Sequence, residues 1–112
     1  MLSPALIEVV DDDTDIRHML QLVLEARGFK VRTHDGAHAY LSAAPVTERR
    51  VMLLDVRMPG MSGLALFEQL IERRLLDMLP VIFLTGHADV PTAVDAVKRG
   101  AFDFCEKPFS DN

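Results

Sequence analysis

The sequence has little cysteine and no long hydrophobic run. Cys105 is the one cysteine in 112 residues, so no disulfide can form within the chain, which fits a reducing cytoplasm. We expect Cys105 to be a small core residue on the last strand rather than a nucleophile. No apolar stretch approaches the roughly 20 residues of a membrane helix, and Met1–Pro4 lacks the pattern of a signal peptide. We therefore expect a cytoplasmic protein with no membrane contact.

Positive charge is also scarce. The chain has 12 Lys and Arg residues against 17 Asp and Glu residues, which gives a net charge of −5. Because DNA binding depends mainly on neutralising phosphate groups, we expect this chain to make no direct contact with nucleic acid. The hydrophobic content of 49% is typical of globular proteins, and the length fits a single domain.

Short apolar runs alternate with helical patterns along the chain, which indicates an α/β fold built from βαβ units around a parallel sheet. Gly28 marks the end of the first helix as a C-cap, and Ser62 marks the start of the third as an N-cap. The predicted strands lie near residues 5–10, 29–34, 50–55, 80–84 and 102–106. The predicted helices lie near residues 14–27, 36–44, 62–74 and 90–99.

The stretch Leu75–Leu79 is apolar where a polar loop would be expected. Two interpretations remain open. We favour a third helix that continues through this stretch into the core. The alternative is an exposed contact patch.

Carboxylates follow two of the predicted strands. Asp11, Asp12 and Asp13 come directly after the first strand, and Asp55 ends the third. Because open α/β sheets place their sites at the carboxyl edge, these acids should lie close together. Like charges at such distances repel one another, and a hard cation relieves that repulsion. The alternative for the first cluster is an acidic helix cap in a solvated loop, and we expect that role for Asp13.

Two further strands end in groups that suit an anion. Thr85 ends the fourth strand and Lys107 follows the fifth. Together with the acids, a hydroxyl and an ammonium group at neighbouring strand ends predict a site for a metal ion and a phosphoryl group. Asp55 is the expected nucleophile, because a carboxylate is ionised at neutral pH and needs no base.

Four motifs follow one another along the chain: Val9–Asp13, Asp55–Gly63, Leu84–His87 and Glu106–Phe109. Their order resembles the receiver domain of two-component response regulators, especially receivers of the FixJ and DctD types. The resemblance covers almost the whole chain. It implies a flavodoxin-like, doubly wound five-stranded parallel sheet with strand order 2-1-3-4-5. Receivers usually have a fifth helix, which is missing here because the chain ends at Asn112, so residues 1–112 are expected to be a fragment of a longer regulator.

The resemblance implies that a sensor histidine kinase transfers a phosphoryl group to Asp55 in the presence of Mg²⁺. Lys107 then neutralises charge on the phosphoryl oxygens, and the domain catalyses only its own phosphotransfer and dephosphorylation. The expected ligands of the metal ion are the carboxylates of Asp11, Asp12 and Asp55 and the backbone carbonyl of Arg57.

The resemblance also implies a switch. Thr85 would donate its hydroxyl to the phosphoryl group, and Phe104 would move inward in response. The face formed by the fourth helix and fifth strand would then change and promote a homodimer that controls transcription. Both residues could instead be ordinary core residues. His87, two positions after Thr85, could influence how fast the phosphoryl group is hydrolysed.

The other histidines suggest no site. We expect His18, His34 and His38 to lie on solvated surfaces, since none has metal-ligand spacing with a cysteine.

Three other classes of protein remain as alternatives. A small Mg²⁺-dependent phosphatase of the haloacid-dehalogenase type uses a D-x-D-x-T/V motif, which would begin at Asp11 but requires Thr or Val where Asp15 stands. A nucleotide-binding Rossmann module needs glycines or hydroxyls after the first strand, where this chain has three acids. A purely structural interaction domain would bind no magnesium.

Overall fold

The computed structural model describes residues 5–46 and 48–107 and contains every predicted strand and helix. Each element ends within two residues of its expected position. The strands are β1 (Leu6–Val10), β2 (Lys30–His34), β3 (Arg50–Asp55), β4 (Val81–Thr85) and β5 (Asp103–Glu106). The helices are α1 (Thr14–Ala26), α2 (Ala37–Ser42), α3 (Gly63–Glu72), a short 3-10 turn η1 (His87–Asp89) and α4 (Val90–Lys98).

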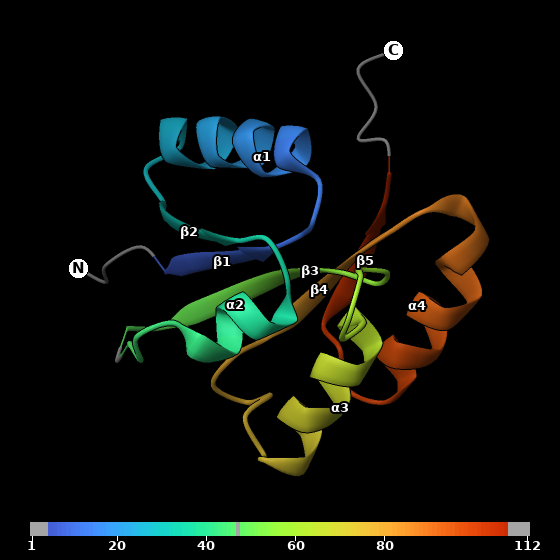
Figure 1. Cartoon of the computed structure of the whole chain (residues 1–112). Helices are drawn as coiled ribbons and strands as arrows, with labels where there is room; N and C mark the ends of the chain where they lie inside the picture. The colour runs from blue at the N-terminus through green and yellow to red at the C-terminus, as the bar shows by residue number, and fades with distance from the viewer. Residues whose placement is uncertain (1–4, 47, 108–112) are drawn as a thin grey trace.

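The strands form one parallel sheet in the order β2-β1-β3-β4-β5, which confirms the predicted flavodoxin-like topology. Helix α1 lies on one face, and α2, α3 and α4 lie on the other (Figure 1). The register of β1 against β3 sets Asp11 beside Asp55. Across the sheet Thr85 pairs with Glu106, so Lys107 follows at the same edge. The parallel order therefore brings all four strand ends together.

The main core lies between the sheet and helices α2, α3 and α4. The rings of Phe67 on α3 and Phe83 on β4 meet edge to face, with centroids 5.2 Å apart. Helix α3 begins as predicted, because the Ser62 hydroxyl oxygen accepts a hydrogen bond from the Ala65 N–H. Buried apolar residues of this core include Val10, Met52, Leu54, Leu66, Phe67, Leu70, Leu79, Val81, Phe83, Ala93 and Ala96.

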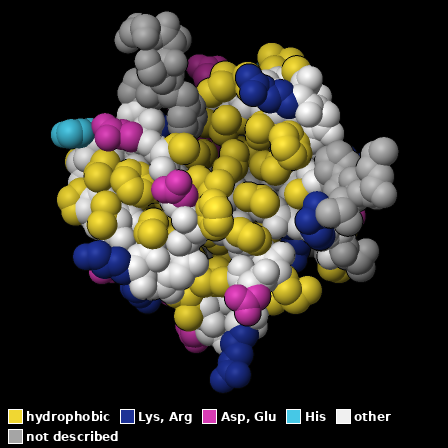
Figure 2. Space-filling model, turned by 180° about the vertical axis from the view of Figure 1, so that it is seen from behind, with side chains coloured by type: hydrophobic (Ala, Val, Ile, Leu, Met, Phe, Trp, Pro, Cys, Tyr) yellow, Lys and Arg dark blue, Asp and Glu magenta, His cyan; other side chains and the backbone are white. Residues whose placement is uncertain are grey.

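The opposite face of the sheet is covered by α1 alone among the described elements. Helix α1 has the predicted amphipathic period, yet none of its residues is buried, and Leu22 is 73% exposed. Figure 2, the view from behind, shows apolar side chains gathered across the middle of the molecule. A fifth helix would fall beyond Lys107, outside the described residues. No helix in the described part of the chain is long and apolar enough to cross a membrane.

The stretch after α3 does not continue that helix, so the favoured interpretation is wrong on this point. The helix ends at Glu72, and Arg74 takes a positive φ of 56°, which breaks the helical path. The stretch does enter the core, because Leu79 is fully buried. Met78 instead faces solvent, with 71% of its surface exposed.

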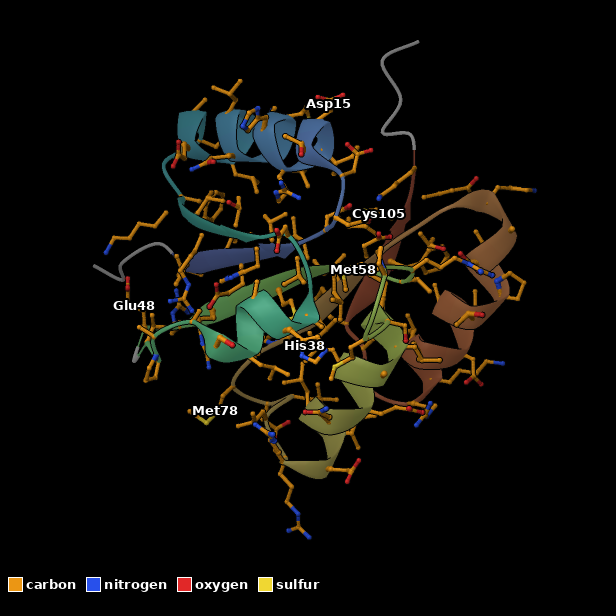
Figure 3. All side chains as sticks on the ribbon, viewed as in Figure 1. Asp15, His38, Glu48, Met58, Met78 and Cys105 are labelled. Atoms are coloured by element: carbon orange, nitrogen blue, oxygen red, sulfur yellow. The ribbon has the colours of Figure 1, made fainter. Side chains whose placement is uncertain are left out.

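Cys105 is exposed, so its expected place in the core is wrong (Figure 3). Side chains alternate along a strand, and its neighbour Phe104 packs against the main core. The strand therefore directs Cys105 toward the other face, which no described element covers at β5. Sequence pattern alone could not show this, because an apolar strand is buried on both faces only where helices cover both.

His34 is buried, so its expected place on the surface is also wrong. Its Nε2 lies 2.8 Å from Oε1 of Glu8, a fully buried acid in the middle of β1. Arg32 donates to both oxygens of Glu8, at 2.8 and 2.7 Å. A buried carboxylate needs such partners, which explains why a polar side chain of β2 turns inward. His18 and His38 are exposed, as expected.

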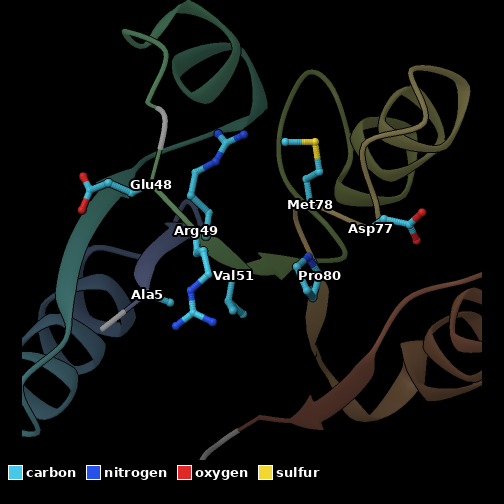
Figure 4. A pocket seen from close by; sticks show the side chains of 8 residues that line it. Ala5, Glu48, Arg49, Val51, Asp77, Met78 and Pro80 are labelled. Atoms are coloured by element: carbon cyan, nitrogen blue, oxygen red, sulfur yellow. The ribbon is translucent and has the colours of Figure 1, made fainter. Parts of the chain in front are cut away.

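A hollow of about 390 Å³ lies at the amino ends of β1, β3 and β4, at the opposite edge of the sheet from the acids. Figure 4 shows the chain segments before β3 and β4 on its two sides. Its walls combine apolar and charged groups, among them Arg49, Val51, Asp77, Met78 and Pro80. It shares no residue with the predicted site.

Candidate functional site at the carboxyl edge of the sheet

Three carboxylates meet at the ends of β1 and β3, as predicted. Asp11 is fully buried, Asp55 is 7% exposed, and Asp12 is open to solvent. One oxygen from each of the three lies within 4.8 Å of the others. Buried strands position two of the acids, and the turn after β1 positions the third. Their mutual repulsion makes this cluster costly unless a cation joins it.

Asp11 is held by its backbone as well as its side chain. Its N–H donates to the carbonyl of His34, and its own carbonyl accepts a hydrogen bond of 2.6 Å from Arg17. Its Oδ1 accepts from the N–H of Asp13. These contacts fix the direction in which the remaining carboxylate oxygen points.

Asp13 takes the capping role expected for it. Its carboxylate accepts hydrogen bonds from the N–H groups of Asp15 and Ile16 at the start of α1. It therefore stands apart from the cluster of three acids.

Lys107 connects the two buried acids. Its ammonium nitrogen lies 2.7 Å from Oδ2 of Asp11 and 3.5 Å from Oδ1 of Asp55. Burial by itself would lower the pKa of this lysine, but contacts with the two carboxylates outweigh that effect and raise it. Lys107 is therefore protonated at neutral pH. Its backbone N–H also donates to the carbonyl of Thr85, which fixes the end of β5 against β4.

Asp55 is the acid most affected by this environment. Burial raises its pKa most, the negative charge of Asp11 raises it further, and Lys107 partly offsets both, which leaves the pKa at about 7. A carboxylate with this affinity for a proton also has a high affinity for another positive charge. The site is thus prepared to receive a cation beside Asp55.

The donor set fits a small divalent ion. Oδ2 of Asp11 is buried and accepts no well-formed hydrogen bond from the described residues, although the Lys107 ammonium forms an ion pair with it. Carboxylate oxygens are the ligands that Mg²⁺ prefers, and exposed Asp12 leaves room for the waters that Mg²⁺ retains. Asp11, Asp12 and Asp55 could therefore hold this ion.

Thr85 ends β4 and Phe104 lies on β5, as predicted, and the Thr85 hydroxyl bonds to its own loop rather than to an acid. This fully buried hydroxyl donates to the carbonyl of Gly86 at 2.9 Å. Phe104 is half-buried against the core. His87 is exposed, and its Nδ1 lies 3.1 Å from Oε2 of Glu106.

Arg57 lies beside the site through its side chain, which the sequence did not indicate. Its Nε donates a 2.7 Å hydrogen bond to Oδ2 of Asp89, before α4. A surface hollow of about 430 Å³ opens beside Asp12, between Arg57, Met58, Pro59 and Ser62. Asp12 is the one acid of the cluster that lines it.

Gly63 ends one of the motifs seen in the sequence, but the sequence indicated no separate role for it. A β-carbon added to it would lie 1.8 Å from the carbonyl oxygen of Asp55, closer than any two such atoms can come. The first turn of α3 therefore packs directly against the backbone of Asp55. Its place directly after the capping Ser62 was the available signal, but a glycine there does not reveal which backbone it approaches.

Comparison with known proteins agrees with this geometry. Residues 7–112 match the family model described as the response regulator receiver domain. The chain is 44% identical to the transcriptional regulatory protein FixJ of Rhizobium meliloti (strain 1021), over 94% of this chain and 50% of that protein. It is 46% identical to the C4-dicarboxylate transport transcriptional regulatory protein DctR of Rhodobacter capsulatus, over 95% of this chain and 54% of that protein.

Solved structures show the same likeness. The crystal structure of FixJ-N has a TM-score of 0.81 at 42% identity, over 98% of this chain and 86% of that one. The chain spans about half the length of the FixJ and DctR proteins compared above. These comparisons give no support to the phosphatase alternative.

Proposed function

Because the chain belongs to the response regulator receiver domains, with relatives that are transcriptional regulators, we propose that it receives a phosphoryl group on Asp55 from a sensor histidine kinase. The observation that supports this most is the position of the Lys107 ammonium between Asp11 and Asp55, in a cluster of three carboxylates. A domain with a purely structural role gains no stability from placing carboxylates of the same charge together.

Each residue has a separate task in the transfer. An oxygen of Asp55 forms a bond to phosphorus while the P–N bond of the phosphohistidine breaks. The imidazole keeps the electron pair of that bond and takes a proton from solvent. Lys107 lies close enough to pair with the phosphoryl oxygens as their charge spreads in the transition state. The domain catalyses only this transfer and its own later dephosphorylation.

Asp11, Asp12, Asp55 and the Arg57 carbonyl would hold Mg²⁺, which supplies positive charge to bring the anionic carboxylate and phosphoryl group together. Asp11 is the fixed member of this set, because its backbone is bonded on both sides. Asp12 is the solvent-exposed member.

The response begins at Thr85. Its hydroxyl leaves the Gly86 carbonyl and donates to the phosphoryl group, which draws residues 86–89 toward the site. Phe104 then moves further inward, favoured by burial of its ring. The surface of α4 and β5 changes, and two copies associate through it. His87 influences how quickly the phosphoryl group is hydrolysed.

The output is transcription, controlled through a further domain. Two observations support this: the relatives are transcriptional regulators of about twice this length, and this chain has a net negative charge unsuited to DNA. In the longer protein a fifth helix would cover the apolar side of the sheet beside α1. We place the domain in the cytoplasm, which the single exposed cysteine supports.

Incubation with acetyl phosphate and magnesium tests the proposal. Intact-mass spectrometry should show one added phosphoryl group in the wild type and none in Asp55→Asn. The matched control is Asp13→Asn, because asparagine caps a helix as well as aspartate and this residue stands outside the cluster. The control should accept the group as the wild type does. Label retained by Asp55→Asn would refute the assignment.

A further inference from the structure

Two contacts hold the loop between β4 and α4, residues 86–89, to neighbouring segments. On one side His87 approaches Glu106 at the end of β5, with both side chains largely exposed. On the other side Arg57 donates to Asp89 at 2.7 Å. The second contact connects this loop directly to the segment that follows Asp55.

The side chain of Asp89 bonds to Arg57 instead of capping its own helix. It is the N-cap residue of α4, where an aspartate commonly accepts hydrogen bonds from free helical N–H groups. Its side chain makes no such bond here and instead accepts from Arg57. Only 12% of the Asp89 side chain is exposed, whereas 79% of the Arg57 side chain is. The acid is held in place, and the guanidinium can move.

The hydrogen bond of Thr85 indicates which movement the Arg57–Asp89 contact restrains. Its hydroxyl donates to the carbonyl of Gly86, so its one proton is engaged within the loop. To reach a group on Asp55, the hydroxyl must turn and the following backbone must move with it. Asp89 lies in that backbone segment, so the movement strains or breaks its bond to Arg57.

We propose that the Arg57–Asp89 ion pair restrains residues 86–89 in the resting conformation, and that a phosphoryl group on Asp55 replaces Asp89 as the partner of Arg57. The inference rests on the proposed phosphorylation of Asp55. The guanidinium belongs to a residue only two positions from Asp55 and lines the hollow beside Asp12. A phosphoryl group offers it greater negative charge and three acceptor oxygens. The released Asp89 carboxylate can then cap α4.

Asp89→Asn tests the restraint without any phosphorylation. Asparagine removes the charge but keeps the shape and the capping ability. In two-dimensional amide NMR spectra of the untreated variant, the signals of residues 86–90 should move part of the way toward their positions in beryllofluoride-treated wild type. Asp95→Asn, on the exposed side of α4, is the matched control and should keep the resting positions. Resting positions in Asp89→Asn would overturn the restraint.

The exchange of partners has its own readout, the Nε–H signal of Arg57, which Arg57→Lys identifies by its absence. This signal should shift when beryllofluoride and Mg²⁺ are added to the wild type. A fixed Arg57 signal alongside shifting signals of residues 86–90 would overturn the exchange.

Failure of the proposed function looks different from failure of this inference. If Asp55 accepts no phosphoryl group, wild type shows no beryllofluoride response. In that case the exchange is refuted, and the restraint is decided by amide hydrogen exchange of residues 86–90. Faster exchange in Asp89→Asn than in wild type and Asp95→Asn supports the restraint, and equal rates overturn it.

Discussion

The α-carbon of Gly63 approaches the carbonyl of Asp55 so closely that a methyl group between them would lie 1.8 Å from the carbonyl oxygen. The partner atom belongs to the backbone of a buried strand, so it cannot rotate away. The start of α3 and the position of the Asp55 backbone are therefore set by one contact.

Gly63→Ala should destabilise the domain by about 3 kcal/mol, because the clash forces α3 away from β3. Phosphorylation of Asp55 should fall with it. Urea unfolding measures the stability. Gly36→Ala is the matched control, since a β-carbon there meets nothing within 4 Å and its backbone is extended. Equal stability of the two variants would contradict this account of Gly63.

Glu8→Gln should cost about 3 kcal/mol at pH 7, because it leaves Arg32 without its charged partner. Burial raises the pKa of Glu8, but hydrogen bonds from His34 and Arg32 outweigh it and lower the pKa from 4.5 to about 2. The stabilisation by ionised Glu8 is thus complete above pH 4.5 and is lost as the pH falls through about 2.

The measurement is urea unfolding of wild type and Glu8→Gln at several pH values. The difference should shrink steadily below pH 4.5. Glu48→Gln serves as the control, because Glu48 pairs with an exposed Lys30 at the surface and should matter little at any pH. A difference that stays constant down to pH 3 would show that Glu8 acts through shape rather than charge.

Asp55→Asn should stabilise the metal-free domain at alkaline pH. Burial and Asp11 raise the folded pKa of Asp55 from 3.8 to about 7. The folded state therefore binds a proton more tightly than the unfolded state, and stability from this group is lost as the pH rises through about 7. At pH 8 in EDTA the variant should exceed wild type by about 2 kcal/mol. The two should converge near pH 4.

Magnesium should reverse that order, since it stabilises wild type and has less to bind in Asp55→Asn. Thermal unfolding with and without magnesium measures both effects. If the variant were less stable than wild type in EDTA at pH 8, the ionised carboxylate of Asp55 would not destabilise the folded domain.

Lys107→Ala should keep the fold and slow phosphorylation by acetyl phosphate at least about tenfold, because no other cation in the described residues lies between Asp11 and Asp55. Far-ultraviolet circular dichroism checks the fold, and intact mass over time gives the rate. Lys98→Ala, in the last turn of α4, is the control for loss of a lysine. Unchanged rates in both variants would remove Lys107 from the mechanism.

The strand ends could be predicted from sequence because parallel topology leaves little freedom. Once Asp11 and Asp55 end two adjacent apolar strands, the register puts them side by side. The caps formed by Asp13 and Ser62 follow from local chemistry in the same way. These features depend on residues close in the chain or on the regular hydrogen bonding between parallel strands.

The features that sequence did not reveal depend on single long-range contacts. His34 is buried because Glu8, 26 residues earlier, needs a partner. Arg57 reaches Asp89 across 32 residues. Cys105 is exposed because no described element covers its side of β5, which the strand's own apolar pattern could not indicate.

The strand order also decides when the site becomes complete. The acids come from central strands, whereas Lys107 follows β5, an edge strand paired only with β4. In the chain, the carboxylates come before the cation that pairs with them. An edge strand has one hydrogen-bonded neighbour, so fewer contacts hold it than hold a central strand. Whenever β5 separates from β4, the ammonium group of Lys107 leaves Asp11 and Asp55. The negative charge of these two acids is therefore balanced only while β5 is docked.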